Sequence, residues 1–274
     1  MKILAIGDIV GRPGREAVKV ILPKLKQEYS LDLVLANAEN AAGGSGITPK
    51  LAEELFNYGI DGLTSGDHIW KRKEIFPFLD TEKRLLRPAN YPLEAPGRGG
   101  AVIEKNGLKM GVINLAGRIF MEGIRSPFEI AKEEIEKLRE ETKVIIVDFH
   151  AEATSEKVAL GWYLDGKVSA VLGTHTHIQT ADEKILPQGT AYITDLGMTG
   201  PYDSVIGRKK ENVLQRFVVQ VPTRFEVAQG DVHLCGAILE IDAKSGKAVS
   251  IVRVDEKLQA SSHKQQAPGL KPEA

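Results

Sequence analysis

The chain has 274 residues, 42% of them hydrophobic and 27% charged, which is typical of a soluble globular protein with room for one large domain or two small ones. Its 36 basic and 37 acidic residues give a formal net charge of −1, so overall charge does not select a nucleic acid or an anionic membrane as partner. A single cysteine, Cys235, excludes an intramolecular disulfide and a multi-cysteine zinc site, and its strand-like surroundings indicate a small buried side chain. No run approaches the ~18 apolar residues of a membrane helix, and Asp8 interrupts the short apolar stretch at the N-terminus, so we expect a cytoplasmic protein without membrane contact.

The first part of the chain alternates strand-like and helix-like segments. Residues 2–6, 32–36 and 60–64 are predicted strands. A turn at 11–14 precedes apolar residues at helical spacing, and Thr48 is placed to cap a second helix. This β-α-β-α-β order predicts a parallel sheet.

The second part of the chain is richer in strands. Two β-rich runs in residues 99–115 flank Lys105-Asn106-Gly107, a hairpin signal, and residues 127–142 form a charged amphipathic pattern typical of a surface helix. The remaining predicted elements are strands at 144–147 and 168–172 around a helix near 155–164, and later strands at 191–194, 216–221, 234–241 and 249–254. We therefore predict an α/β fold of two packed mixed sheets flanked by helices, with one domain over residues 1–260 and a disordered tail at 261–274.

Side chains that bind metals follow several of the predicted strands. Four of the six histidines lie in three short segments, 66–68, 148–150 and 173–177, and each segment follows a strand-like run. Ligands of open α/β sheets bind beyond the carboxyl ends of the strands, so a single site could collect these side chains. The candidates are Asp8, Glu39, Asn40, Asp67, His68, His150, His175 and His177. Such oxygen and nitrogen donors suit manganese, iron or zinc, and their number fits a pair of ions about 3.5–4 Å apart.

Taken singly, most of these residues have a plainer interpretation. Asp8 could cap a turn or helix, Glu39-Asn40 could be a polar loop pair, and His150 could be a hydrogen-bonded structural residue. His175 and His177 carry the strongest signal, because alternate residues of a strand-like segment share a face. The two other histidines, His233 and His263, are expected to lie outside the site.

Two glycine-rich segments suggest phosphate binding only weakly. The glycines at positions 7, 11 and 14 depart from the G-x-G-x-x-G spacing, and Asp8 stands where a pyrophosphate would approach. The loop 43–46 lacks the Gly-Lys-Ser/Thr of a P-loop, so we interpret it as a mobile flank of the site.

The order of these motifs resembles that of the calcineurin-like metallophosphoesterases, and within them the YmdB-like branch. The resemblance covers nearly the whole chain and rests on the segments 7–11, 38–44, 66–68, 173–180 and 194–200. Val10 occupies the place of the first histidine of the wider superfamily, and Glu39 stands in place of its usual bridging aspartate.

This resemblance implies a phosphodiesterase with a two-metal centre of iron or manganese that acts on 2′,3′-cyclic nucleotides through a hydroxide bridging the metals. It also implies self-association. By the same resemblance Asp8, Asn40 and His177 would hold the first metal, Glu39 would bridge, Asp67, His150 and His175 would hold the second, and His68 would be the proton donor. The family usually has Asn in place of Asp67, so the extra negative charge is expected to tighten the second ion and reduce its Lewis acidity.

Other functions fit the same residues. A phosphomonoesterase or nuclease would use the same metal centre, and an RNA-associated regulatory protein could keep it as a scaffold. The near-neutral charge argues against strong RNA affinity, and His68 argues for catalysis, because a scaffold needs no proton donor. Arg12, Arg87 and Asn90 are either substrate contacts or structural residues.

Overall fold

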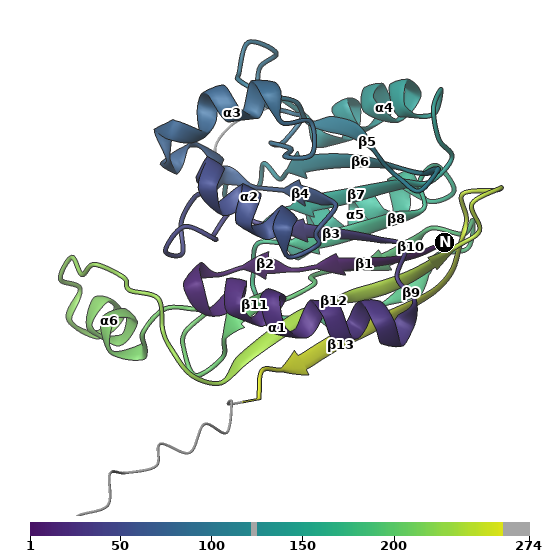
Figure 1. Ribbon diagram of the computed structural model, residues 1–274. Coiled ribbons are helices and arrows are strands. Elements are labelled where there is room, and N and C mark those ends of the chain that lie inside the picture. The colour runs from purple at the N-terminus through teal and green to yellow at the C-terminus, as the bar shows by residue number, and fades with distance from the viewer. Residues whose placement is uncertain (122–124, 260–274) are drawn as a thin grey trace, which may run out of the picture.

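The computed structural model describes residues 1–121 and 125–259, and in it two β-sheets pack against each other with helices on their outer faces (Figure 1). One sheet has seven strands in the order β2-β11-β12-β1-β3-β4, with β13 beside β12, and the other has six in the order β5-β6-β7-β8-β10-β9. The predicted fold class, an α/β fold of two packed mixed sheets flanked by helices, is confirmed. The predicted tail at 261–274 lies outside the described residues, and the single domain over 1–260 stays a prediction. No helix among the described residues is long and apolar enough to cross a membrane.

The seven-stranded sheet is built from both ends of the chain. Its strands are β1 (Lys2–Ile6), β2 (Asp8–Ile9), β3 (Leu33–Asn37), β4 (Gly62–Thr64), β11 (Met198–Pro201), β12 (Val232–Ile241) and β13 (Ala248–Lys257). β1 pairs in parallel with β3 and antiparallel with β12, so the predicted parallel β-α-β-α-β unit is joined by a late hairpin. Cys235 on β12 is buried, as predicted.

The six-stranded sheet comes from the middle of the chain. Its strands are β5 (Gly100–Lys105), β6 (Leu108–Ala116), β7 (Ile145–His150), β8 (Ala170–Thr174), β9 (Lys184–Ile185) and β10 (Ala191–Ile193). β6, β7, β8 and β10 run parallel, and β5 forms the predicted antiparallel hairpin with β6. Asn106 and Gly107 connect that hairpin with φ of 52° and 78°, the conformation of a two-residue type I′ turn.

Helices cover the outer faces of the two sheets (Figure 1). The helices of the described residues are α1 (Gly11–Tyr29), α2 (Pro49–Asn57), α3 (Phe76–Thr81), α4 (Pro127–Leu138), α5 (Thr154–Leu164) and α6 (Lys210–Leu214), together with the 3₁₀ turns η1 (Asp67–Lys71) and η2 (Lys73–Ile75) and the π-helical turn η3 (Gln215–Val219). Of these, α6 and η3 lie away from the sheets (Figure 1). Thr48 caps α2, because its Oγ1 accepts a hydrogen bond from the backbone N–H of Leu51 at 3.3 Å. The predicted helix at 127–142 ends earlier, at Leu138.

Apolar residues on opposite faces of the same strand belong to different cores. On β1, Leu4 and Ile6 pack under the first helices, whereas Ile3 and Ala5 pack between the two sheets. A third core lies between the six-stranded sheet and α4 and α5. Strands covered on both faces are apolar without alternation, which is why residues 2–6 are a continuous hydrophobic run.

The strand predicted at 216–221 is wrong. These residues belong to an excursion that contains α6 and η3 and projects from the body of the fold (Figure 1). Phe217, Val218 and Val219 are 73%, 78% and 60% exposed. Strand propensity expresses packing against neighbouring strands, and this segment pairs with none, so its backbone bonds locally, as in the bond from Gln220 N–H to the Arg216 carbonyl.

Close backbone contacts explain two of the N-terminal glycines. A Cβ on Gly7 would lie 1.9 Å from the carbonyl oxygen of Gly197, and one on Gly14 would lie 2.2 Å from that of Thr199. The glycines therefore allow β2 and α1 to approach the β11 segment, and no dinucleotide is needed to account for them.

Gly7→Ala should lower the free energy of unfolding by about 3 kcal/mol, because the new methyl group meets rigid backbone rather than a flexible side chain. Gly107→Ala is the matched control. Its Cβ would meet nothing within 4 Å, so only its left-handed φ is strained, at a cost of about 1 kcal/mol. Chemical denaturation of both variants measures the difference, and equal losses would contradict this account of the packing.

Candidate metal centre

The eight candidate residues of the sequence lie together at one end of the two sheets. Asp8 lies on β2, directly after β1, Glu39 and Asn40 follow β3, and Asp67 and His68 begin η1 after β4. In the other sheet His150 ends β7, and His175 and His177 follow β8. The carboxyl ends of parallel strands from both sheets thus meet at one site, as the strand-end pattern predicts.

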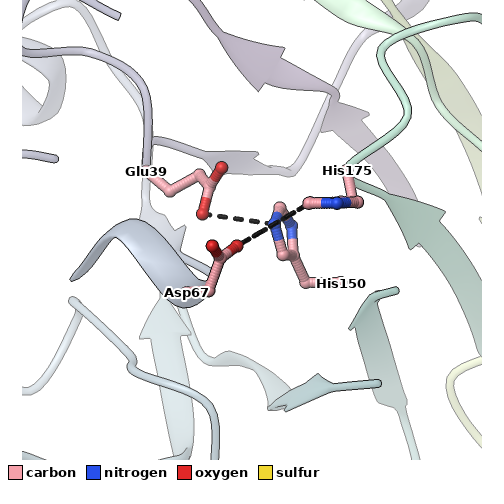
Figure 2. A group of neighbouring side chains, drawn as sticks. All are labelled: Glu39, Asp67, His150 and His175. Carbon is pink, nitrogen blue, oxygen red and sulfur yellow. Dashed lines mark hydrogen bonds and ion pairs between the residues drawn. The ribbon is translucent and has the colours of Figure 1, made fainter. Parts of the chain in front are cut away.

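His150 is the fully buried centre of the cluster (Figure 2). Its Nε2 lies 3.2 Å from Glu39 Oε2, 3.3 Å from Asp67 Oδ1 and 2.9 Å from His175 Nδ1. One donor atom from each of these four residues lies within 4.8 Å of the others, close enough to hold a metal ion.

Asn40 joins the remaining candidates to this group. Its Nδ2 lies 2.8 Å from Glu39 Oε1 and 3.2 Å from His177 Nε2, and its Oδ1 lies 2.8 Å from His68 Nδ1. Asp8 approaches from the other side, where its Oδ2 accepts a hydrogen bond from the backbone N–H of His175 at 3.2 Å. All eight side chains therefore form one connected network.

The donors of this network fit metal ions. The buried Oδ1 atom of Asp8 accepts no hydrogen bond, and the Oδ1 atom of Asp67 has only the ion-pair contact with His150 Nε2 at 3.3 Å, although a buried carboxylate oxygen without a well-placed donor is unfavourable. A cation would satisfy both atoms. Carboxylate, carboxamide and imidazole groups are also the ligands that first-row metal ions take.

The charges of the network are strongly coupled. Burial raises the pKa of Asp8 to about 6, and burial together with the neighbouring His150 lowers the pKa of His175 to about 4. Burial is the largest single effect on His150 and opposes its charge, but the Glu39, Asp67 and Asp8 carboxylates together outweigh burial and raise the pKa of His150 well above its usual value. Without a metal, a proton on His150 balances the carboxylates. Because a coordinating histidine must be neutral, metal and proton compete for this cluster.

The conformation expected for His175 and His177 is wrong, although both reach the site. β8 ends at Thr174, and the two histidines have φ of 99° and 68°, in the left-handed region rather than in an extended strand. This backbone is strained for residues other than glycine, so surrounding bonds must hold it.

Asp195 and Lys157 hold the strained turn. Asp195 Oδ2 accepts hydrogen bonds from the backbone N–H and the hydroxyl of Thr176, at 3.1 and 2.7 Å. The same oxygen pairs at 2.8 Å with the Nζ of Lys157, a side chain of α5 that is buried completely. The ion pair therefore fixes Thr176, which stands between the two histidines.

A second buried network orients His150. Thr174 Oγ1 lies 3.0 Å from His150 Nδ1 and donates to Asp148 Oδ1 at 2.7 Å. Burial raises the pKa of Asp148, which also accepts a hydrogen bond from Asn37 at 3.0 Å. With Nδ1 engaged in this way, Nε2 of His150 faces the cluster, the arrangement expected of a supported metal ligand.

Sequence reasoning missed these supporting residues and one further contact, from Glu152 Oε2 to His175 Nε2 at 3.1 Å. Alternation along β7 could have placed Asp148 on the same face as His150, and Glu152 follows that histidine by two residues. No sequence signal identifies Lys157, because a buried lysine looks like any other lysine of an amphipathic helix.

The other candidates lie outside the network. Arg87 donates to the carbonyls of Pro88 and Pro96, and Asn90 bonds the backbone of Ala116, so both have structural contacts. Arg12 is exposed and pairs with Glu16. Outside the cluster, as expected, His233 pairs with Asp231 and Asp255, and His263 lies outside the described residues. The glycine-rich loop 43–46 is held from outside, because Arg208 donates hydrogen bonds to the backbone carbonyls of Gly43 and Gly44.

Lys157→Met should lower the free energy of unfolding by about 3–5 kcal/mol and weaken metal binding, because it leaves Asp195 charged, buried and unpaired. The double variant Lys157→Met with Asp195→Asn should recover part of the stability but not the metal affinity, since the neutral side chain holds Thr176 less firmly. Chemical denaturation and metal titration measure the two effects. Lys132→Met, at an exposed position, is the control and should change stability by less than about 0.5 kcal/mol. A Lys157 variant as stable as this control would contradict the assigned role.

Comparison with known proteins agrees with the fold and with the family resemblance of the sequence. A family model described as YmdB-like protein matches residues 4–254. The 2′,3′-cyclic-nucleotide 2′-phosphodiesterase of Bacillus subtilis (strain 168) is 51% identical over 254 residues, which cover 93% of this chain and 96% of that protein.

Two crystal structures are also similar over nearly their whole length. A hypothetical protein from Thermus thermophilus has a TM-score of 0.88 and 41% identity, and the match covers 94% of this chain and 99% of that one. A structure described as a novel phosphatase from Mycoplasma pneumoniae has a TM-score of 0.87 and 37% identity, covering 94% of each chain. The chain therefore belongs to the family of YmdB-like proteins.

Proposed function

We propose that this protein is a metal-dependent phosphodiesterase that hydrolyses 2′,3′-cyclic nucleotides. The observation that carries the proposal is the cluster of Glu39, Asp67, His150 and His175, whose donor atoms lie within 4.8 Å of one another at the carboxyl ends of the strands. The 51% identical relative from Bacillus subtilis, described as a phosphodiesterase of this class, supports the choice of substrate.

The ligands divide into two groups around Glu39. Asp8, Asn40 and His177 would hold one cation, and Asp67, His150 and His175 would hold the other, with Glu39 between them. The contacts from Asn40 to both Glu39 and His177 support this division, as do those from His150 to both Glu39 and Asp67. The oxygen and nitrogen donors favour iron or manganese over metals that prefer thiolates.

Two such cations, when bound, would supply Lewis-acid charge to the phosphate oxygens and a water whose pKa is lowered to ~7. The protein itself supplies the proton for the leaving group. Nδ1 of His68 contacts Asn40 Oδ1 at 2.8 Å and Glu39 Oε1 at 3.3 Å, so the ring is held at the cluster with Nε2 as its less engaged nitrogen. His68 is half-buried and lines the cavity beside the cluster, and we assign it the transfer of a proton to the leaving ribose oxygen.

A phosphomonoesterase is the second candidate, because the structure from Mycoplasma pneumoniae is described as a phosphatase. The same metal ligands would serve either reaction, so the two functions are distinguished by comparing the hydrolysis of phosphodiesters with that of a phosphomonoester. We further propose a single domain over residues 1–260, a cytoplasmic location, self-association and association with RNA. The family resemblance supports self-association. The net charge of −1 argues against strong binding of RNA, so RNA is the less well supported of the two partners.

His68→Ala should lower the turnover of 2′,3′-cyclic AMP by about 10²- to 10⁴-fold while the protein keeps its metal, because only the proton donor is removed. His150→Ala is the contrasting variant and should lose metal and activity together. Elemental analysis of each purified protein and product formation from 2′,3′-cyclic AMP, bis-p-nitrophenyl phosphate and a phosphomonoester give the measurements.

Several outcomes of this experiment would count against the proposal. Loss of metal from His68→Ala would make that residue a ligand. Faster hydrolysis of the monoester than of both diesters would favour the phosphatase. Wild-type protein that holds metal but hydrolyses none of the three would favour a binding protein.

Asp67→Asn should weaken metal binding by at least about 10-fold and raise turnover at saturating metal. The carboxamide keeps an oxygen donor but removes a negative charge that draws the ion in and reduces its Lewis acidity. Competition with a chromophoric chelator measures the affinity, and rates at saturating metal measure turnover. Equal affinity in the two proteins would show that the charge of Asp67 does not act on the ion.

A further inference from the structure

The candidate metal centre opens into a cavity of about 360 Å³ that is lined by two chemically different groups of residues. One group consists of polar residues of the cluster and its neighbours: Glu39, Asn40, His68, Glu152, His175, Thr176 and His177. The other group comes from residues 205–225 and is mostly apolar: Val205, Ile206, Val213, Phe217 and Phe225, with Arg208 among them. We call these five apolar residues the apolar wall.

The apolar wall belongs to the excursion that carries α6. The start of this excursion is fixed to the candidate metal centre. The carbonyl of Ile206 lies 3.0 Å from His177 Nδ1. The two ends of the excursion are joined by the bond from Lys209 N–H to the Glu226 carbonyl at 2.9 Å, and Arg208 donates to the glycine-rich loop. The wall therefore has a defined position relative to the cluster.

The aromatic rings of the wall are available to a ligand. Phe217 is 73% exposed and Phe225 is 41% exposed. Within the described residues neither ring packs against another aromatic ring. Exposed apolar groups at the rim of a polar site commonly mark the place where a ligand or partner binds.

The position of each exposed residue distinguishes a substrate from a partner protein. Val213 and Phe217, four residues apart, both line the cavity, whereas their exposed neighbours Leu214 and Val218 do not. A contact surface for a second copy of the chain would consist mainly of Leu214 and Val218, which are exposed outside the cavity. Phe217 and Phe225 instead face the same space as the metal ligands.

Hydrolysis of a phosphodiester does not by itself require an apolar wall, but a nucleoside substrate does offer a partner for one. Stacking of a base on an aromatic ring contributes about 1–3 kcal/mol and tolerates any base. The cavity is also within the usual size of sites for small ligands, about 300–1,000 Å³.

We propose that Phe217 and Phe225 bind the nucleobase of the substrate and so make the site selective for mononucleotides over cyclic phosphodiesters that lack a base. This inference rests on the proposed function and adds the group that recognises the base. Because stacking depends on ring area, purine nucleotides should bind more tightly than pyrimidine nucleotides.

The test compares 2′,3′-cyclic AMP with glycerol 1,2-cyclic phosphate, which has the same five-membered cyclic diester and no base. Phe217→Ala and Phe225→Ala should each lower kcat/KM for 2′,3′-cyclic AMP by about 5- to 100-fold, mainly through KM, and change it less than twofold for the glycerol diester. Phe217→Trp should keep the selectivity. Val218→Ala, exposed but outside the cavity, is the matched control and should leave both rates unchanged.

Titration with adenosine gives a readout that needs no turnover. Wild-type protein should bind adenosine more tightly than either alanine variant does. The proposal would be overturned if the alanine variants lost kcat/KM equally for both diesters, or if the ratio of the two kcat/KM values were the same as in the wild type. A change in sedimentation without a change in selectivity would assign the aromatic rings to contacts between copies instead. If the wild type hydrolyses neither diester, the proposed function fails, and the adenosine titration still tests the wall.

Discussion

The structure depends on placing several ionisable side chains out of water within a few ångströms of each other. His150 is completely buried and contacts Glu39, Asp67 and His175 through a single nitrogen. Burying charges is unfavourable unless each one is paired, and the buried Oδ1 atom of Asp8 has no hydrogen-bond donor. A cation bound at the cluster would resolve this imbalance, so the arrangement that is unfavourable in the folded protein by itself suits a metal ion.

The surrounding fold is organised to maintain that arrangement. Asp148 and Thr174 orient His150 from behind, and Asp195, paired with Lys157, holds the turn that carries His175. A Cβ on Gly66 would lie 2.2 Å from Cδ2 of the His150 ring, so only glycine allows η1 to approach so closely. The positions of the candidate ligands are therefore set by buried contacts from the sheets, from α5 and from the ordered segments between strands.

The lining of the cavity is where we place the selectivity of the site. The polar lining residues could bind a phosphate ester, and the apolar wall offers a surface for a nucleobase. Phe217 of the wall lies in residues 216–221, where the sequence predicts a strand and the structure has a helical turn. The valines and the phenylalanine of this segment resemble a strand because they are apolar and bulky, but outside a sheet the same side chains are left exposed.

The sequence by itself determined the class of fold and a group of polar residues that gather at one end of the sheets. Continuous apolar runs identified strands buried on both faces, and the polar residues after them, from Asp8 to His177, identified the eight residues of the network, though not Glu152, because parallel strands end at one edge. Only the tertiary structure decided how those residues are held. The left-handed turn at His175, the buried Lys157 and the apolar wall depend on contacts between residues far apart in the chain, and local sequence patterns do not encode such contacts.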